Sequence, residues 1–292
     1  MSDGSGRAPV SLADTLDLET IEEDIYRGVS PDESLQRVFG GQVAAQALVA
    51  AGRTVPPERP VHSLHAYFIR PGDPAVPIVY TVDRIRDGRS FTTRRVVAVQ
   101  HGKAIFSLSA SFQRPEDGPG YQDPMPDAPD PETVPVWQDR LRELGDQVPA
   151  RWLRPRPVEV RYPGVPPWAA RQDPAGHEPG NMVWLRSATP LPDDPLWHVC
   201  AVTYASDLTL LDAVLLGMGE AWDEAAVTGA SLDHAMWFHG PFRADDWLLY
   251  VQRSPAAGGA RGLATGQIFR RDGLLIASVV QEGLIRVTQR ND

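Results

Sequence analysis

The sequence predicts an α+β protein made of two tandem units, each a curved antiparallel sheet wrapped around a long apolar helix. Three observations lead to this prediction. Segments of the first half recur in the second half, each half contains one run of small apolar residues, and the predicted strands alternate between apolar and polar positions. A sheet that curls around a helix hides both the helix and one face of the sheet.

The internal repeat follows from two matches along the chain. The segment HSLHAYFIRP at 62–71 is echoed by SLDHAMWFH at 231–239, which aligns His65 with His234 at an offset of 169. The glycine turns at Gly102 and Gly273 precede apolar strands and differ by 171. A near-constant offset over several strands predicts two copies of one unit.

The first helix is predicted at 42–51, where alanine and other small residues lie on every side. A glycine pair at 40–41 opens this run and Gly52 can close it. Because no face of the run is polar throughout, we expect the helix to be enclosed by the sheet.

The second helix is predicted at 208–216. Ser206 and Asp207 precede this apolar run and Gly217 follows it. A Ser/Asp start and a glycine stop are typical helix ends, so Asp207 is expected near the opening of this helix.

The strands are predicted from their period of two. Between 104 and 112 the apolar residues share one face and three serines share the other. The dipeptides Asp87-Gly88 and Asp272-Gly273 have the chemistry of tight hairpin turns.

A proline-rich and acidic segment separates the two units. Seven prolines between 114 and 136 exclude a helix or a central strand there. We therefore predict an N-terminal unit at 10–114, a linker at 115–150 and a C-terminal unit at 151–288.

Charge and cysteine usage limit the function classes. The formal net charge of -10 argues against nucleic-acid binding over the whole surface, because phosphate binding depends on concentrated positive charge. With Cys200 as the one cysteine, an intramolecular disulfide and a zinc site of several cysteines are excluded. The chain starts without a signal-peptide pattern, and its longest uncharged run, 38–52, is shorter than the ~20 residues of a membrane helix. A cytoplasmic protein is expected.

Several motifs taken together resemble the acyl-CoA thioesterase II family. They are VFGGQVAAQAL (38–48), YFIRPGD (67–73), RDGRSF (86–91), YASD (204–207), DHAMWFH (233–239) and VQEG (280–283). The resemblance extends from about residue 18 to residue 286 and is weakest in the linker. It implies a double hotdog fold and the hydrolysis of fatty acyl-CoA to a free fatty acid and coenzyme A.

The resemblance also implies which residues are catalytic. The family uses an Asp, a Thr or Ser, and a Gln on the second unit, which correspond here to Asp207, Ser231 and Gln281. Many members have Thr where this chain has Ser231, so the hydroxyl is kept but its rotamer is less restricted. Attack by a water molecule is expected, with no metal, no cofactor and no covalent intermediate.

The repeat points to the same positions. Gln281 aligns with Ala110, so an amide in the second half replaces a methyl group in the first. A buried amide without partners costs about 1–3 kcal/mol, so nearby groups must satisfy it. The first half lacks both the amide and the carboxylate, which predicts one site per chain, on the second unit.

Other expectations concern the substrate and the partners. The coenzyme A phosphates are expected to bind arginines, for which the candidates are Arg70, Arg84, Arg86, Arg89, Arg94 and Arg95. Acyl-CoA is the expected partner. The resemblance also suggests a homo-oligomer, which exposed sheet edges make physically plausible. Two alternatives stay open: a hotdog hydratase or dehydratase, for which His62, His65 or His234 could pair with an Asp, and an acyl-CoA binding protein without activity.

Overall fold

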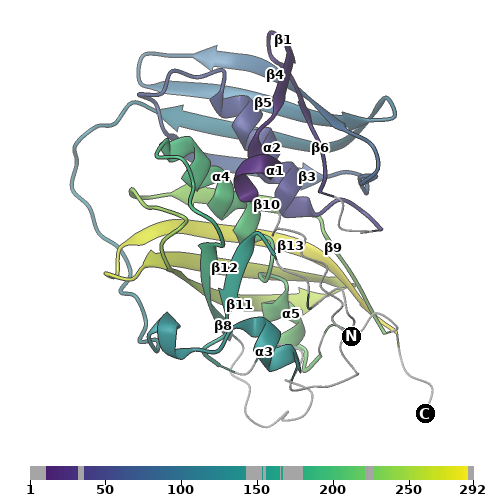
Figure 1. The fold of residues 1–292 in the computed structure, drawn as a ribbon, viewed down its shortest axis with the longest axis vertical. Coiled ribbons are helices and arrows are strands. Elements are labelled where there is room, and N and C mark those ends of the chain that lie inside the picture. The colour runs from purple at the N-terminus through teal and green to yellow at the C-terminus, as the bar shows by residue number, and fades with distance from the viewer. Residues whose placement is uncertain are drawn as a thin grey trace, which may run out of the picture.

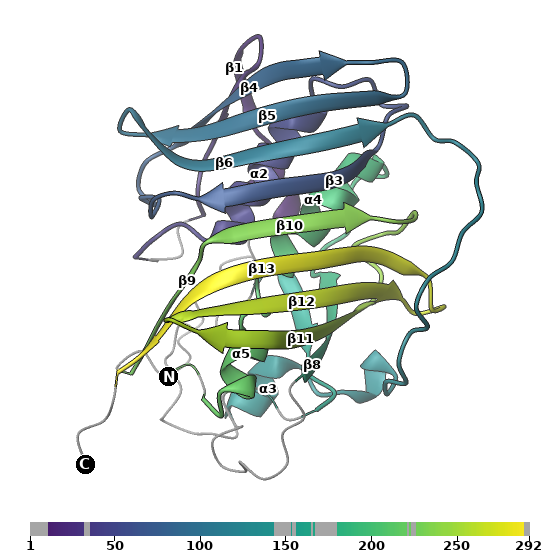
Figure 2. The same cartoon turned by 180° about the vertical axis from the view of Figure 1, so that it is seen from behind.

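In the computed structural model, the described residues include thirteen strands, which form one continuous antiparallel sheet. The structure describes residues 11–31, 36–142, 153, 156–164, 166, 180–220, 222 and 226–288. From one edge to the other, the strands run β1 (Glu19–Glu22), β2 (Ile25–Gly28), β4 (Ile78–Asp87), β5 (Phe91–Gln100), β6 (Lys103–Gln113), β3 (Val61–Phe68), β10 (Asp233–Phe238), β13 (Leu275–Val287), β12 (Arg261–Arg270), β11 (Leu248–Gly258), β8 (Gly180–Ser187) and β7 (Val158–Arg161). The remaining strand, β9 (Val227–Ser231), pairs with β13 (Figures 1 and 2).

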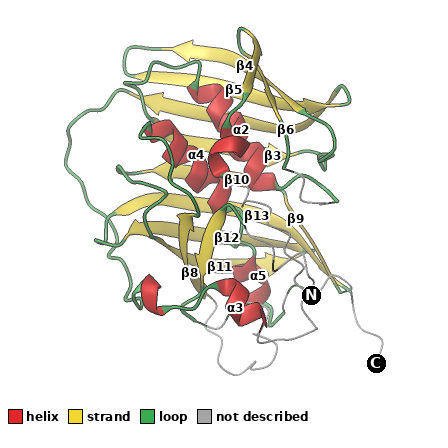
Figure 3. Ribbon diagram, viewed as in Figure 1, coloured by secondary structure: helices red, strands yellow, loops and turns green. Residues whose placement is uncertain are grey.

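The sheet order shows two related halves that meet at β3 and β10. On the first side of this junction the order is β4-β5-β6-β3, and on the second side it is β10-β13-β12-β11. The two central strands pair antiparallel, from Asp233 opposite Tyr67 to Trp237 opposite Ser63. The halves therefore share one sheet, and the main helices of both lie on the same side of it (Figure 3). This arrangement agrees with the predicted double hotdog.

The first long helix, α2 (Gly40–Gly52), lies where the sequence predicts it. All of its residues from Gly41 to Ala51 are buried, because the sheet covers one side and a second helix covers the other. That second helix is α4 (Pro195–Ser206). The shorter helices are α1 (Leu12–Leu16), α3 (Trp137–Arg142), α5 (Asp212–Gly217) and the 3₁₀ turn η1 (Pro131–Thr133).

The predicted position of the second helix was wrong. The helix that packs against α2 is α4, which ends where the predicted one was to begin. Its true start is Asp194, whose side chain accepts a hydrogen bond from the Leu196 N–H and which precedes a proline. Asp207 is consequently the C-terminal cap of α4, and of the predicted segment 208–216 only residues 212–216 are helical, within α5.

Helices α2 and α4 run antiparallel and approach closely through glycine. A Cβ atom on Gly41 would lie 2.5 Å from the Tyr204 carbonyl oxygen near the end of α4. A Cβ atom on Gly52 would lie 2.6 Å from the side chain of Leu196 near the start of α4. The N-terminal end of α2 is thus in contact with the C-terminal end of α4.

The strand faces are as predicted, but the alignment of the two halves is not. Along β6 the side chains of Phe106, Leu108, Ala110 and Phe112 are buried. His65, however, is exposed, whereas His234 is buried. A shift of one residue moves a side chain to the other face of a sheet, so the match of these two histidines was wrong. When Gln281 is matched to Ala110, the strand register makes Leu64 the counterpart of His234.

The proline-rich segment after β6 covers part of the outer face of the second half. Met125 and Ala128 pack on a cluster of Trp184, Trp247, Leu249, Phe269 and Leu275. Gln122 bonds to the β12–β13 turn, with its Nε2 donating to Gly273 O at 2.8 Å and its Oε1 accepting from the Leu275 N–H at 3.1 Å. No α-helix or strand occurs between 114 and 130, whereas α3 lies within the predicted linker 115–150. The extended backbone that proline favours thus becomes a strap over apolar residues.

Two further findings concern predicted properties. Cys200 is buried in α4, and burial raises the pKa of its thiol. Within the described ranges, no helix has both the length and the apolar character of a membrane span.

We expect Gly41→Ala to lower the free energy of unfolding by about 1–3 kcal/mol, because the added methyl group would push α2 away from the Tyr204 carbonyl. Urea denaturation followed by circular dichroism measures this change. Gly217→Ala is the matched control, since the nearest atom to its new Cβ would be Ser254 Cβ at 3.9 Å. Equal stability of the two variants would contradict the close packing of the helices.

Candidate active site

The three residues that the sequence analysis selected lie together. Ser231 Oγ donates a hydrogen bond to Asp207 Oδ1 at 2.9 Å, and Gln281 Nε2 donates to the same oxygen at 2.5 Å. Asp207 and Ser231 are partly exposed, whereas Gln281 is fully buried. The cluster therefore has a carboxylate that solvent can reach and that two side-chain donors fix through one of its oxygens.

Each of these side chains comes from a different element. Asp207 caps α4, Ser231 ends β9, and Gln281 lies in the middle of β13 on its buried face. Pairing of Ser231 with Gly283 brings β9 alongside β13. The sheet register thus places the hydroxyl two residues along from the amide, and α4 delivers the carboxylate to both.

The first half of the chain contributes the start of α2. A Cβ atom on Gly40 would lie 2.7 Å from Asp207 Oδ2 and 2.8 Å from the Phe68 ring, so only glycine fits here. The first hydrogen bond inside α2 runs from the Val43 N–H to Phe39 O, and the Phe39 side chain makes no capping bond. The N–H groups at 40–42 precede this bond, and they form the positive end of the helix dipole. The site therefore lies between the two halves.

The sequence analysis missed Gly40 and Arg37 as residues of this site. Arg37 Nη2 donates to Gly229 O at 2.6 Å, which ties the segment before α2 to the strand that carries Ser231. A glycine pair at the start of a predicted helix was the available signal. It indicated a helix end, but it could not show which carboxylate would come close to it.

The corresponding place in the first half has different chemistry. Arg53 caps α2 as Asp207 caps α4, and it bonds to Asp17 at 2.8 Å. Leu64 and Ala110 occupy the positions that His234 and Gln281 hold in the second half. The polar cluster is thus specific to one end of the helix pair.

Arg94 fills the interior near that place and is not a surface arginine. Its side chain is 1% exposed, and its guanidinium bonds to Thr54 Oγ1 at 2.8 Å, to Thr54 O at 3.1 Å and to Asp87 Oδ1 at 2.7 Å. It was therefore wrong as a candidate for binding the coenzyme A phosphates. Of the other candidates, Arg84 pairs with Asp24 and Arg95 pairs with Asp83, all at the surface.

The histidines considered for a hydratase mechanism bond to residues other than Asp207. His62 Nε2 lies 2.8 Å from Ser111 Oγ, and the ring of His65 packs edge-on against Trp237. His234 is buried near the cluster, but its Nε2 contacts Ser206 Oγ at 2.8 Å. The groups that bond directly to Asp207 among the described residues are a hydroxyl and an amide.

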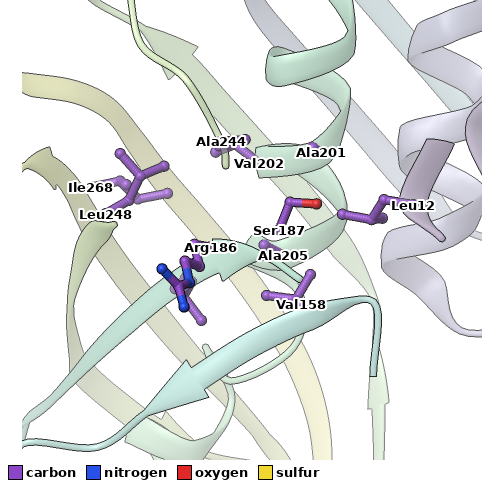
Figure 4. Close-up of a pocket in the computed structure, with 11 residues that line it drawn as sticks. Leu12, Val158, Arg186, Ser187, Ala201, Val202, Ala205, Ala244, Leu248 and Ile268 are labelled. Carbon is purple, nitrogen blue, oxygen red and sulfur yellow. The ribbon is translucent and has the colours of Figure 1, made fainter. Parts of the chain in front are cut away.

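A small apolar cavity lies against α4, where Leu12 of α1 meets residues of the second half (Figure 4). Ala201, Val202 and Ala205 line it from the helix, and Leu248 and Ile268 line it from the sheet. Its volume of about 10 Å³ is room for one water molecule at most. An acyl chain could enter this space only if the surrounding side chains moved.

Comparison with known proteins connects this geometry to a chemistry. A family model described as acyl-CoA thioesterase N-terminal domain matches residues 30–113, and one described as acyl-CoA thioesterase matches residues 157–284. The chain is 40% identical to human acyl-coenzyme A thioesterase 8, over 95% of this chain and 89% of that protein. It is 38% identical to acyl-CoA thioesterase 2 of Haemophilus influenzae, over 96% of this chain and 98% of that protein.

A solved structure agrees with the sequence relatives. The crystal structure of the acyl-CoA thioesterase II TesB2 from Mycobacterium marinum superposes with a TM-score of 0.78 and is 45% identical. The match covers 96% of this chain and 99% of that chain. Both halves of the fold therefore have counterparts in that enzyme.

We expect Arg94→Met to lower the free energy of unfolding by about 2–4 kcal/mol, because it removes several buried hydrogen bonds and leaves the Thr54 carbonyl without its donor. Arg95→Met is the matched control, since the Arg95 side chain is 53% exposed, and its effect should stay within about 0.5 kcal/mol. Thermal and urea denaturation compare the two. A loss as small for Arg94 as for Arg95 would refute a structural role for the buried guanidinium.

Proposed function

Because this chain belongs to the acyl-CoA thioesterase family and hydrolyses acyl-CoA thioesters, we propose that it does so at one site, between the start of α2 and the end of α4. Asp207, Ser231 and Gln281 are the catalytic residues in this proposal. The N-terminal unit, 10–114, supplies backbone donors, and the C-terminal unit, 151–288, supplies the side chains. The supporting observation is the convergence of two donors on a single oxygen of Asp207.

The carboxylate is arranged to hold a water molecule. Oδ1 accepts the hydrogen bonds from Ser231 and Gln281, the two donors to Asp207 among the described side chains, so Oδ2 can accept one from water. Gln281 Nε2 has a second N–H, and Ser231 Oγ keeps lone pairs, so both can bind the same water. A water held by three groups approaches the thioester carbonyl in a restricted geometry, which lowers the entropy cost of the attack.

The reaction then follows in two steps. The water oxygen forms a bond to the carbonyl carbon while Asp207 takes up the proton, which gives a tetrahedral intermediate with a negative oxygen. Backbone N–H groups at 40–42 are the donors for this oxygen, because they precede the first hydrogen bond of α2 and lie at the positive helix end. The C–S bond breaks next, the sulfur receives the proton from Asp207, and the products are the free acid and coenzyme A.

The cellular context is part of the same proposal. We propose a cytoplasmic enzyme, consistent with a fold whose one cysteine is buried and unpaired. A homo-oligomer is supported by the edge strands β1 and β7, which have one neighbour each in the sheet order. Light scattering after size-exclusion chromatography tests the oligomer, and a monomer at micromolar concentration would reject it.

We expect Asp207→Asn to lower kcat by about 10²–10⁴-fold, because Asn keeps the shape but cannot accept the proton from water. Release of free thiol from a saturated acyl-CoA measures this rate and also separates hydrolysis from hydration and from binding alone. Asp194→Asn is the matched control at the other end of α4, since Asn caps a helix as well as Asp. Full activity of the Asp207 variant would remove this residue from the mechanism.

We expect Gly40→Ala to lower kcat by about 10²–10³-fold, because the new methyl group would lie 2.7 Å from Asp207 Oδ2 and displace the carboxylate from the start of α2. Thiol release and thermal melting are measured on the same preparation. A folded variant with unchanged turnover would show that the N-terminal half does not contribute to the site.

A further inference from the structure

A buried histidine, His234, is the cross-strand neighbour of the proposed catalytic residue Gln281. His234 is 1% exposed and lies on β10. Ala235 pairs with Val280, and the same register carried one residue further places His234 opposite Gln281. Both side chains are buried, so they share the inner face of the sheet as cross-strand neighbours. The mechanism above gives this histidine no part.

The Asp207 carboxylate fixes which end of the Gln281 amide faces it. A carboxylate oxygen only accepts hydrogen bonds, so the Gln281 atom at 2.5 Å from Asp207 Oδ1 must be the nitrogen. The amide oxygen, Oε1, then points away from Asp207. Among the described residues, Gln281 Oε1 and His234 Nδ1 are both buried atoms without a well-formed hydrogen bond. Each is the kind of atom that the other needs.

The second ring nitrogen of His234 is already held. Nε2 lies 2.8 Å from Ser206 Oγ, on the last residue of α4. The same hydroxyl lies 2.9 Å from Thr203 O, so its single proton has two acceptors within reach. Burial lowers the pKa of the ring, and the charge of Asp207 only partly opposes this effect. The ring is therefore neutral at pH 7, and only one nitrogen carries a proton.

We propose that His234 is a positioning residue, which donates from Nδ1–H to Gln281 Oε1 and accepts at Nε2 from Ser206 Oγ–H, whose proton then points to the ring and not to Thr203 O. This inference rests on the proposed function of Gln281. It assigns a defined tautomer to the ring, because an amide oxygen can only accept. The ring connects Ser206 at the end of α4 to the Gln281 amide on β13. Helix α4 therefore carries Asp207 and, through the ring, also orients the amide that donates to Asp207.

The effect on catalysis follows from the two orientations of an amide. With the histidine donor in place, Oε1 is fixed and the nitrogen faces Asp207 and the water. Without that donor, a flipped amide would place Oε1 against the carboxylate, and the water would lose an N–H partner. The counterpart pair in the first half, Leu64 and Ala110, is apolar and holds no such group.

Three substitutions separate positioning from mere packing. His234→Asn keeps a hydrogen-bond donor at the place of Nδ1, and His234→Gln keeps a polar group at the place of Nε2. His234→Leu introduces the residue that the first half has at the matching position, Leu64. We expect His234→Asn to keep kcat within about threefold, and His234→Gln and His234→Leu to lose about 10–100-fold in kcat with KM nearly unchanged. Equal losses for Asn and Gln would overturn the assignment to Nδ1.

A double-mutant cycle tests whether His234 acts through Gln281. In a Gln281→Ala background, His234→Leu should lower kcat less than twofold further, because the group that it orients is gone. Multiplied losses would show an independent, structural effect and reject the proposal. If Gln281→Ala alone leaves kcat unchanged, the proposed function of the trio fails instead, so the two failures are distinguishable.

The tautomer can be observed without any assay of activity. With ¹⁵N-labelled histidine, His234 should show a protonated Nδ1 and an unprotonated Nε2 at pH 7, assigned by comparison with the His234→Asn protein. The signal should change in Gln281→Ala, where the acceptor is lost. A ring protonated at Nε2 in the unmodified enzyme would overturn the proposal.

Discussion

The antiparallel packing of α2 against α4 is the interaction on which the site depends. A carboxylate at the C-terminal end of its own helix is unfavourable, because that end of the dipole is negative. Asp207 is nevertheless placed there, and the positive start of α2 lies against its second oxygen through the space that Gly40 leaves open. Gly41 and Gly52 permit the close approach of the two helices. The positive end of the α2 dipole then offsets the unfavourable interaction of the Asp207 carboxylate with the negative end of α4.

The two halves share a scaffold and differ in how they use it. Each has a buried helix, a curved sheet and a capping residue at the helix end, but the caps are Arg53 and Asp207. The first half places apolar side chains, Leu64 and Ala110, at the sheet positions where the second half has a histidine and a glutamine. Buried polar groups destabilise a core unless they are satisfied, and each half satisfies its own set: Arg94 bonds to Thr54 in the first half, and Gln281 bonds to Asp207 in the second.

Part of this arrangement was predictable because it is local. The helix at 40–52 has glycines at its ends and small residues on all sides, and the strand at 104–112 alternates with a period of two. The trio came from motifs that resemble a known family, and the structure places its members within hydrogen-bonding distance. The second helix was misplaced because 195–206 and 208–216 are both apolar and each follows a residue pair suited to a helix start, Asp194-Pro195 and Ser206-Asp207, so local signals alone do not choose between them.

The sequence by itself determined the class of fold, the duplication, the enclosed first helix and the residue types of the site, since propensity, period and motif are properties of neighbouring residues. Only the tertiary structure decided that Asp207 ends a helix, that Arg94 is interior and that His234 lies beside Gln281. Each of these depends on strand register or on contact between elements that are far apart in the chain. A register shift of one residue reverses which face a side chain occupies, and no local pattern records which distant strand will be its neighbour.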